Sequence, residues 1–305
     1  MTRLLMLLAL LVIIPARAQT LSLTFDDGLD PDTQPAAAGW NAQLLAHLEQ
    51  LQIHAMVFPS LARTGTGNGT ALIAQWSAAG HAVGNHTSEH RSLAANSTSL
   101  ATFIEQVEQA QRHYGHLPGW QRMLRFPYLK EGNTADKRDG MRSWLEENDY
   151  RAAPVSIDAS DWYYNQLYLS WLENGDSDKA GQIQQAYIQH LLDRAAYYEQ
   201  LARQLLGRSP DHVLLLHTNQ LNADALPQLV SAFQGHGWRF ISPLQAFDDP
   251  LYRQQPDILP AGESIVWALA KAQDLPGLRY PAEDARYEQP ALQAQGLVPA
   301  KSAPR

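Results

Sequence analysis

Short apolar stretches alternate along the chain with longer segments in which apolar residues recur every three or four positions. Short apolar runs are typical of strands that are buried on both faces. The longer spacing is typical of amphipathic helices with one face against a core. The strands predicted in this way cover residues 21–25, 55–58, 81–84, 123–126, 151–157, 212–216 and 238–241.

Helices are predicted between these strands. The first two are marked by apolar residues on one face, namely Trp40, Leu44, Leu48 and Leu51, and then Leu72, Ile73 and Trp76. Ser97 or Ser99 can cap a third helix that runs to about residue 114. The others cover about 136–148, 179–206 and 222–235. Because strand–helix alternation predicts a parallel sheet, we favour a (β/α) barrel over an open sheet for a chain of 305 residues.

Two regions depart from this alternation. Residues 163–178 insert aromatic and acidic side chains before the long helix. After Ser242 the chain is rich in proline, with one short helical stretch near 263–273, and its last fifteen or so residues are predicted to be unstructured. We see no internal repeat.

The first 18 residues have the features of a secretory signal peptide. Arg3 precedes a long apolar run, and Ala16 and Ala18 provide the small residues of a cleavage site that would leave Gln19 first. The apolar run is shorter than the ~20 residues that a membrane-spanning helix needs, so an uncleaved anchor is the minor alternative. We therefore expect an exported protein, periplasmic or secreted, without stable membrane insertion.

Composition narrows the possible chemistry. The chain has no cysteine, which excludes cysteine nucleophiles, thiolate metal sites and a lipid-modified cysteine. Its formal net charge of −8 becomes −10 when Arg3 and Arg17 leave with the signal peptide. An acidic protein of this kind is a poor partner for nucleic acid or an anionic membrane.

Ionisable and aromatic residues gather where the predicted strands end. In (β/α) barrels the active site lies at the carboxyl ends of the strands. Strands two and seven are expected to contribute little there. The other ends carry Asp26 and Asp27, His86 and His90, Arg125 with Tyr128, Asp158 with Asp161 and Trp162, and finally His217.

A metal would explain two adjacent carboxylates. His86 and His90 are four residues apart, so one helical turn would place both imidazoles on the same side. Two imidazoles and one carboxylate suit Zn²⁺, and the second carboxylate would remain free as a base beside a metal-bound water. The alternatives are an Asp-Gly turn after the strand, a chance histidine pair, and a capping role for Asp158.

Five short motifs at these strand ends resemble the polysaccharide deacetylases, the family-four carbohydrate esterases with a NodB homology domain. They occur in the expected order as TFDDG (24–28), HTSEH (86–90), RFPY (125–128), DASDW (158–162) and LLLH (214–217). The resemblance implies a distorted (β/α) barrel of about seven parallel strands that hydrolyses N-acetyl groups on sugars. It implies a catalytic domain at 19–245 between the signal peptide (1–18) and a partly disordered, proline-rich extension (246–305).

The resemblance also implies roles for individual residues. Asp27, His86 and His90 would hold one divalent metal ion, with Zn²⁺ first and Co²⁺, Ni²⁺ or Mn²⁺ as alternatives. Asp26 would be the general base, oriented by Arg125. His217, on the rim opposite the metal, would be the general acid, with its pKa tuned by Asp161. The Tyr128 backbone N–H would stabilise the oxyanion, and Trp162 and Leu214 would line the pocket for the acetyl methyl group.

The substrate would be an acetylated glycan of the chitin, peptidoglycan or poly-N-acetylglucosamine type. Two other functions stay open at this point. The same site could belong to an O-acetyl esterase or a small-amide hydrolase. The chain could also be a non-catalytic glycan-binding protein that uses the aromatic side chains Tyr163, Tyr164, Tyr168 and Trp171.

Overall fold

The computed structural model describes residues 19–299, so the predicted signal peptide lies outside the described residues. Within this range a seven-stranded parallel sheet has the order β6–β4–β3–β2–β1–β7, with β8 also paired to β1. The seven strands are β1 (Thr20–Asp27), β2 (Met56–Pro59), β3 (Ala82–Asn85), β4 (Trp120–Leu124), β6 (Arg151–Ala152), β7 (Asp211–His217) and β8 (Arg239–Phe240).

One edge of β1 is shared between two neighbours. Its first residues pair with β8, and its last four, Thr24–Asp27, pair with β2. Its other edge pairs with β7 from Thr20 to Asp26, in a register that places Asp26 beside His217. The sheet curls further because the segment after β6 crosses to β7, where Ile157 forms a parallel bridge with Leu214. The predicted distorted barrel is confirmed.

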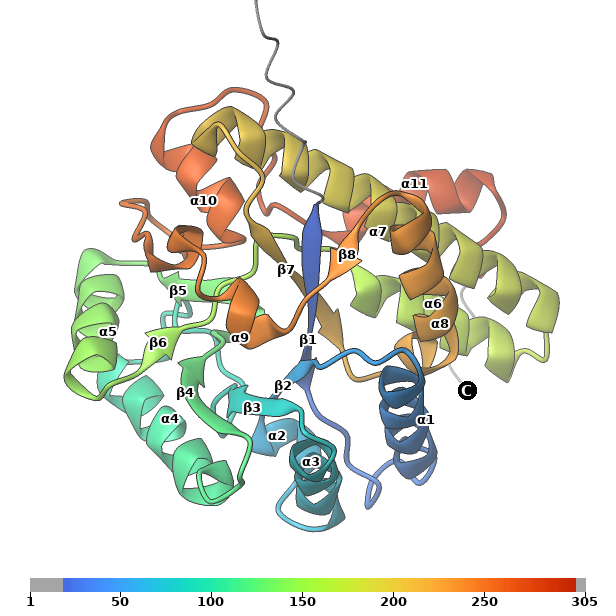
Figure 1. The fold of residues 1–305 in the computed structure, drawn as a ribbon, viewed down its shortest axis with the longest axis horizontal. Helices are drawn as coiled ribbons and strands as arrows, with labels where there is room; N and C mark the ends of the chain where they lie inside the picture. Colours follow the sequence, from blue (N-terminus) through green and yellow to red (C-terminus); the bar gives the residue numbers. More distant parts are fainter. Residues whose placement is uncertain (1–18, 300–305) are drawn as a thin grey trace, which may run out of the picture.

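Helices surround the strands on the outside, as Figure 1 shows. The predicted helices are present, and the Ser99 side chain caps the third by accepting a hydrogen bond from the Thr102 N–H. Those outside the C-terminal region are α1 (Ala37–Gln50), α2 (Leu61–Thr64), α3 (Asn68–Ala78), α4 (Leu100–Tyr114), α5 (Ala135–Glu147), α6 (Asp161–Glu173), α7 (Ser177–Leu206) and α8 (Gln220–Gly235). A 3₁₀ turn, η1 (Pro127–Leu129), follows β4.

Helix α6 accounts for the aromatic insert. Tyr163, Tyr164 and Tyr168 are all buried, and α6 packs against α7 and α8. The Tyr168 hydroxyl donates a hydrogen bond to Asp224, and the Trp171 indole N–H donates one to the Leu297 carbonyl. Because these side chains belong to the packing between helices, the insert does not present an aromatic glycan-binding surface.

The helical stretch predicted near 263–273 is present after residue 245 as α10. Its side chains Val266, Trp267 and Leu269 are buried, and the helix packs on α7. The elements of this C-terminal region are α9 (Pro243–Ala246), η2 (Pro250–Arg253), β9 (Ala261–Gly262), α10 (Ile265–Ala272) and α11 (Ala285–Ala294), with β9 pairing antiparallel to β5 (Lys130–Gly132).

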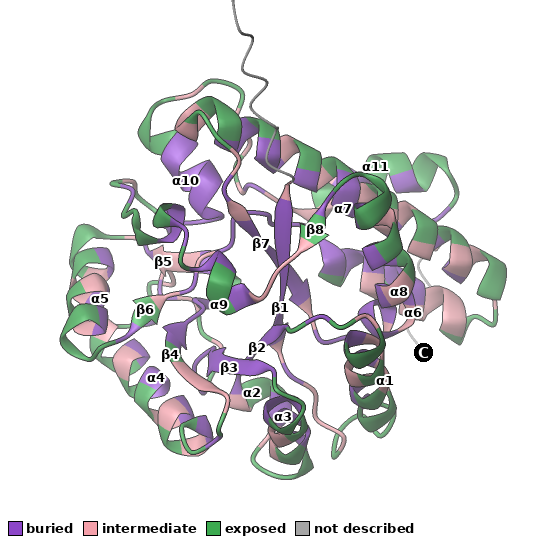
Figure 2. Cartoon of the chain, in the orientation of Figure 1, coloured by how far each residue is buried: buried purple, intermediate pink, exposed green. Residues whose placement is uncertain are grey.

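The core follows the predicted pattern. In Figure 2 the central strands are buried and the outer faces of the helices are exposed. The β1 side chains Leu21, Leu23 and Phe25 are completely buried, and Phe25 contacts the Trp76 ring of α3. None of the helices in residues 19–299 is long and apolar enough to cross a membrane.

Candidate active site

The end of β1 turns sharply at the two aspartates. Asp27 has a positive φ of 81°, and Gly28 follows with a φ of 86°. A Cβ atom on Gly28 would lie 2.4 Å from the Thr64 side chain, so the glycine is required both by its backbone conformation and by lack of space. A non-glycine residue in a left-handed conformation is uncommon and is often found at functional sites. The turn directs both carboxylates to the carboxyl end of the barrel.

Asp26 is buried and paired with a buried arginine. The Arg125 Nη1 donates to Asp26 Oδ1 at 2.9 Å, while its Nε donates to the Ala153 carbonyl at 2.5 Å and its Nη2 to the Thr24 hydroxyl at 3.2 Å. The guanidinium also lies 4.5 Å from the centre of the Phe58 ring. These contacts fix the guanidinium, so Asp26 is held in one orientation with its charge compensated.

His86 and His90 converge through a turn and not through the helical turn expected from their spacing. Residues 86–99 contain no helix, and both Thr87 and His90 have positive φ values. The turn is held because the Thr87 N–H donates to the Asn85 side chain and the His90 N–H to the Thr87 hydroxyl. The two imidazole rings lie 4.9 Å apart.

Asp27, His86 and His90 present ligand atoms that lie within 4.8 Å of one another. The His86 Nδ1–H donates to the Arg125 carbonyl at 2.7 Å, which leaves Nε2 to face Asp27 Oδ1 at 3.8 Å. Burial lowers the pKa of His86 to about 4, against the opposing effect of Asp26, so this imidazole is neutral, as a metal ligand must be.

The carboxylate of this trio has an oxygen without a hydrogen-bond partner. Asp27 Oδ1 is buried and lies 3.1 Å from His90 Nε2 without a well-directed hydrogen bond between them. Burial favours the protonated carboxyl, but His90, His217 and His86 outweigh it and hold the pKa of Asp27 well below its usual range. One anionic oxygen and two imidazole nitrogens around the same point fit a divalent cation.

An arginine missed by the sequence analysis also reaches this trio. Arg63 lies in α2, directly after β2, a strand that was expected to contribute little. Its Nε is 3.6 Å from Asp27 Oδ2, and its Nη2 is 3.5 Å from His90 Nδ1. Only its position after a strand end could have indicated it, because Arg63 is part of none of the five motifs.

His217 and Asp161 form a second charge pair, in which Asp161 is buried and His217 is partly exposed. The His217 Nδ1 is 2.7 Å from Asp161 Oδ1, and Asp161 Oδ2 accepts from the His217 backbone N–H at 2.8 Å and the Asn222 side chain at 2.9 Å. Burial disfavours the charged imidazolium, but Asp161 outweighs it and raises the pKa of His217 to about 10. His217 is on the strand next to Asp26, and not on the opposite rim as the sequence suggested, because β7 is the direct neighbour of β1.

One cavity of about 570 Å³ is lined by Asp26, Asp27, Arg63, His86, His90 and His217. Arg125 and Asp161 do not line it and are fully buried. Tyr128 and Trp162, predicted to bind substrate, also line it, with exposed fractions of 59% and 47%. Leu215 lines the cavity in place of the predicted Leu214, which is fully buried elsewhere. The reason is strand alternation, since the residue two before His217 shares its side of the strand and the residue three before does not.

Asp158 lies in the cavity wall and does not cap α6, whose N-cap residue is Ser160. Its carboxylate accepts a hydrogen bond from the Ala159 N–H at 2.8 Å. Burial, together with Glu283 and Glu263, raises the pKa of Asp158 well above its usual range. Glu263 and Glu283 come from the C-terminal region and also line the cavity, which the sequence analysis did not foresee.

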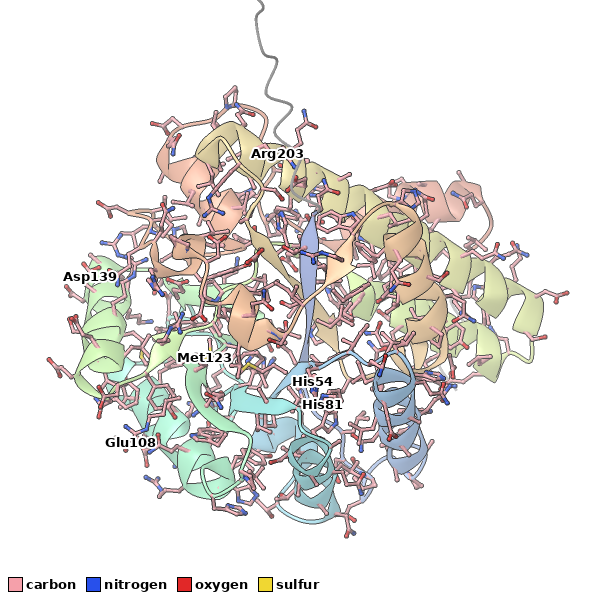
Figure 3. The ribbon with its side chains drawn as sticks, viewed as in Figure 1. His54, His81, Glu108, Met123, Asp139 and Arg203 are labelled. Atoms are coloured by element: carbon pink, nitrogen blue, oxygen red, sulfur yellow. The ribbon has the colours of Figure 1, made fainter. Side chains whose placement is uncertain are left out.

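A second pair of neighbouring histidines lies outside the cavity and belongs to ordinary packing. His54 and His81, labelled in Figure 3, precede β2 and β3 and so lie at the amino ends of the strands. Their rings are 6.2 Å apart, and His81 accepts a hydrogen bond from the Ala55 N–H and contacts Trp76. Burial and His54 lower the pKa of His81 to about 4, and this pair has no place among the candidate metal-binding groups of the described residues.

Comparisons with known proteins agree with this geometry. Residues 14–144 match the family model described as polysaccharide deacetylase. A polysaccharide deacetylase from Bacillus cereus is similar in structure, with a TM-score of 0.53 and 23% identity over 73% of this chain and 91% of that chain. The chitin deacetylase of the fungal pathogen Colletotrichum lindemuthianum has a TM-score of 0.50 and 20% identity over 76% of this chain and 88% of that chain.

A pseudoenzyme of carbohydrate esterase family four from Bacillus anthracis is also similar, with a TM-score of 0.50 and 12% identity over 76% of this chain and 66% of that chain. No curated protein matches. Likeness at these identities shows the fold alone. Because an active enzyme and a pseudoenzyme can share one fold, an argument about activity has to rest on the residues in the cavity.

Proposed function

We propose, because residues 14–144 match the polysaccharide deacetylase family model, that this chain is an exported, metal-dependent hydrolase that removes N-acetyl groups from an acetylated amino-sugar polymer or oligosaccharide. The observation that carries this proposal is the convergence on one cavity of three parts: the trio Asp27, His86 and His90, the Asp26–Arg125 pair, and the His217–Asp161 pair. A glycan-binding protein needs neither a base nor an acid in its binding site.

Asp27, His86 and His90 would hold the divalent ion, with Zn²⁺ as the first choice. When bound there, such an ion lowers the pKa of water and polarises a carbonyl group. The protein side of this arrangement is the orientation of the ligands. The His86 ring is held by the Arg125 carbonyl, and the His90 ring lies against Tyr128 with their centres 4.8 Å apart.

Asp26 is the residue best suited to accept a proton from the attacking water. Its Oδ1 is engaged by Arg125, whereas Oδ2 lies 3.7 Å from His86 Nε2 on the cavity side. Arg125 makes three further contacts, with a backbone carbonyl, a hydroxyl group and an aromatic ring. The guanidinium therefore stays in place when the charge of Asp26 changes. Asp26 can therefore take up a proton in a fixed position.

His217 is suited to give a proton to the departing amine. The amine of an amide is a poor leaving group unless it is protonated as the C–N bond breaks. Asp161 holds the His217 Nδ1, which leaves Nε2 for the substrate, and it keeps the ring charged at neutral pH. Asp26 and His217 are register partners on β1 and β7, so a single substrate carbonyl carbon can lie within reach of both.

Tyr128, Trp162 and Leu215 would complete the site. The Tyr128 peptide would donate its N–H to the developing oxyanion, while Trp162 and Leu215 would contact the acetyl methyl group. Two exposed aromatic rings at a cavity opening suit the apolar faces of sugar rings.

The direct test is acetate release from three purified substrates: N-acetylated chitooligosaccharides, peptidoglycan and O-acetylated xylan. We expect release from at least one of the first two, and loss of that release with a chelator. Release from xylan alone would replace the N-deacetylase by an O-acetyl esterase. Saturable binding of a glycan without any acetate release would favour a binding protein and overturn the proposal.

A further inference from the structure

The loop that follows β4 has an unusual backbone. Tyr128 and Leu129 both have positive φ values, of 58° and 55°, although neither is glycine. Such conformations cost of order 1–3 kcal/mol each and persist only where the surrounding structure holds them. Tyr128 is also 59% exposed, so its own side chain provides little of the packing that could hold the loop.

The loop has one internal hydrogen bond from the Leu129 N–H to the Phe126 carbonyl at 2.9 Å, and further contacts come from residues 261–263, which we call the strap. The strap lies more than a hundred residues further along the chain. Its strand β9 pairs antiparallel with β5, in a register that places Lys130 beside Gly262. The Glu263 N–H then donates to the Leu129 carbonyl at 2.9 Å. The Glu263 carboxylate pairs with the Lys130 ammonium and also accepts from the Ala282 N–H at 3.2 Å.

Gly262 allows the strap to lie this close. A Cβ atom at this position would be 2.0 Å from the Leu129 carbonyl oxygen and 3.0 Å from the Lys130 Cα. Its φ of +127° is also one that other residues rarely adopt. The loop and the strap are therefore in direct backbone contact at the Leu129 carbonyl, one residue after Tyr128.

The strap itself is firmly anchored. Its residues are buried, and the Ser264 side chain that follows caps α10 by accepting from the Trp267 N–H at 3.1 Å. The Ile265 N–H donates to the Val155 carbonyl at 2.8 Å, in the segment that closes the barrel between β6 and β7. The strap thus connects the Tyr128 loop to the barrel and to the buried helix α10.

We infer that the strap, residues 261–263, is a positioning element of the active site, which holds the Tyr128 peptide where the oxyanion forms. The inference rests on the proposed function and adds a part of the chain that the five motifs do not include. It implies that the catalytic unit extends beyond residue 245. A deacetylase lacking these contacts would keep its base, its acid and its metal-binding trio but would lose alignment of the Tyr128 N–H.

The test compares Gly262→Ala with Gly277→Ala in the full chain. Gly277 also has a positive φ, of +81°, but a Cβ there meets nothing within 4 Å, so it controls for backbone strain alone. We expect Gly262→Ala to lower kcat on an N-acetylated chitooligosaccharide about 10- to 100-fold with little change in KM, because a small misplacement of a stabilising donor acts on the transition state. Gly277→Ala should keep the kcat of the unaltered protein.

Two further measurements separate positioning from a general loss of structure. Amide hydrogen exchange of the segment 126–133 should rise in Gly262→Ala while its thermal midpoint falls no further than that of Gly277→Ala. If Gly262→Ala does not fold, Glu263→Ala should show the loss of kcat and faster exchange. Glu263→Gln keeps one of the two acceptor oxygens, so it should restore part of the kcat.

The results that would overturn this inference differ from those that would overturn the proposed function. If the unaltered protein releases no acetate, the proposed function fails. If it is active and Gly262→Ala and Glu263→Ala keep its kcat, the inference is overturned. A rise in KM alone for Glu263→Ala would also overturn it, because that result would make Glu263 a substrate contact.

Discussion

Replacing His217 by alanine tests the acid role most directly. The structure places its Nδ1 against Asp161, which leaves Nε2 available to donate a proton, and its pKa is raised to about 10. General acid catalysis is typically worth ~10²–10⁴-fold, or about 3–5 kcal/mol of the barrier. We expect His217→Ala to lose about that much kcat on an N-acetyl sugar.

The leaving group provides the internal comparison. An activated aryl acetate departs as a phenolate that needs no proton, so His217→Ala should lose far less kcat on that substrate. Acetate release from a chitooligosaccharide and phenolate release from an aryl acetate would be measured on the same preparation. His113→Ala is the matched control, because that histidine contacts Thr70 on the outside of the barrel.

The pH dependence of activity tests the His217–Asp161 pair as a unit. The raised pKa means that His217 is the acid form below about pH 10, and activity that needs this form falls as pH rises through that value. A bound dication would cancel the attraction of Asp26 and Asp27, so the loaded enzyme should lose activity somewhat earlier. Asp161→Asn removes the main cause of the raised pKa, which should move the alkaline limb of kcat/KM to lower pH. Equal losses of His217→Ala on amide and aryl ester, or an alkaline limb that Asp161→Asn leaves in place, would refute the reasoning.

Two further predictions concern the metal and the N-terminus. Purified protein should contain about one divalent ion, measured by elemental analysis; His86→Ala or His90→Ala should lower its metal content, whereas Asp26→Asn should keep the ion and lose ~10²–10⁴-fold in kcat. Retention of the ion by Asp27→Asn and its loss by Asp26→Asn would reverse the roles of the two aspartates. Protein exported by its native host should begin at Gln19, and an intact Met1 or Thr2 found by mass spectrometry of the N-terminus would rule this out.

The parts of the fold that the sequence predicts best are those specified locally. The strands near 21–25 and 212–216 are continuous apolar runs, and the barrel follows from their alternation with helices. The Ser99 cap depends on residues three positions apart. Predicting these features needs only a short window of sequence, because the physical cause lies within that window.

The parts that could not be predicted depend on distant partners. Arg63 reaches Asp27 only because β2 and β1 are neighbours, and Glu263 reaches Lys130 across most of the chain. The sequence analysis expected a helical turn to bring His86 and His90 together. In the structure a turn with positive φ values brings them together instead. The last fifteen or so residues were expected to be unstructured, yet α11 continues to Ala294 and its Leu292 is buried.

Strand register explains why the errors in the predicted site residues were small. Asp26 and His217 are partners in the β1–β7 ladder, so their closeness follows once the two strands are adjacent. The same alternation that brings His217 to the cavity also brings Leu215, two residues earlier, and turns Leu214 away. A shift of β7 by one residue would reverse all three positions, and with them the proposed acid and the proposed acetyl pocket. The chemistry at the strand ends is therefore as strictly specified as the core beneath it, because the same ladder sets both.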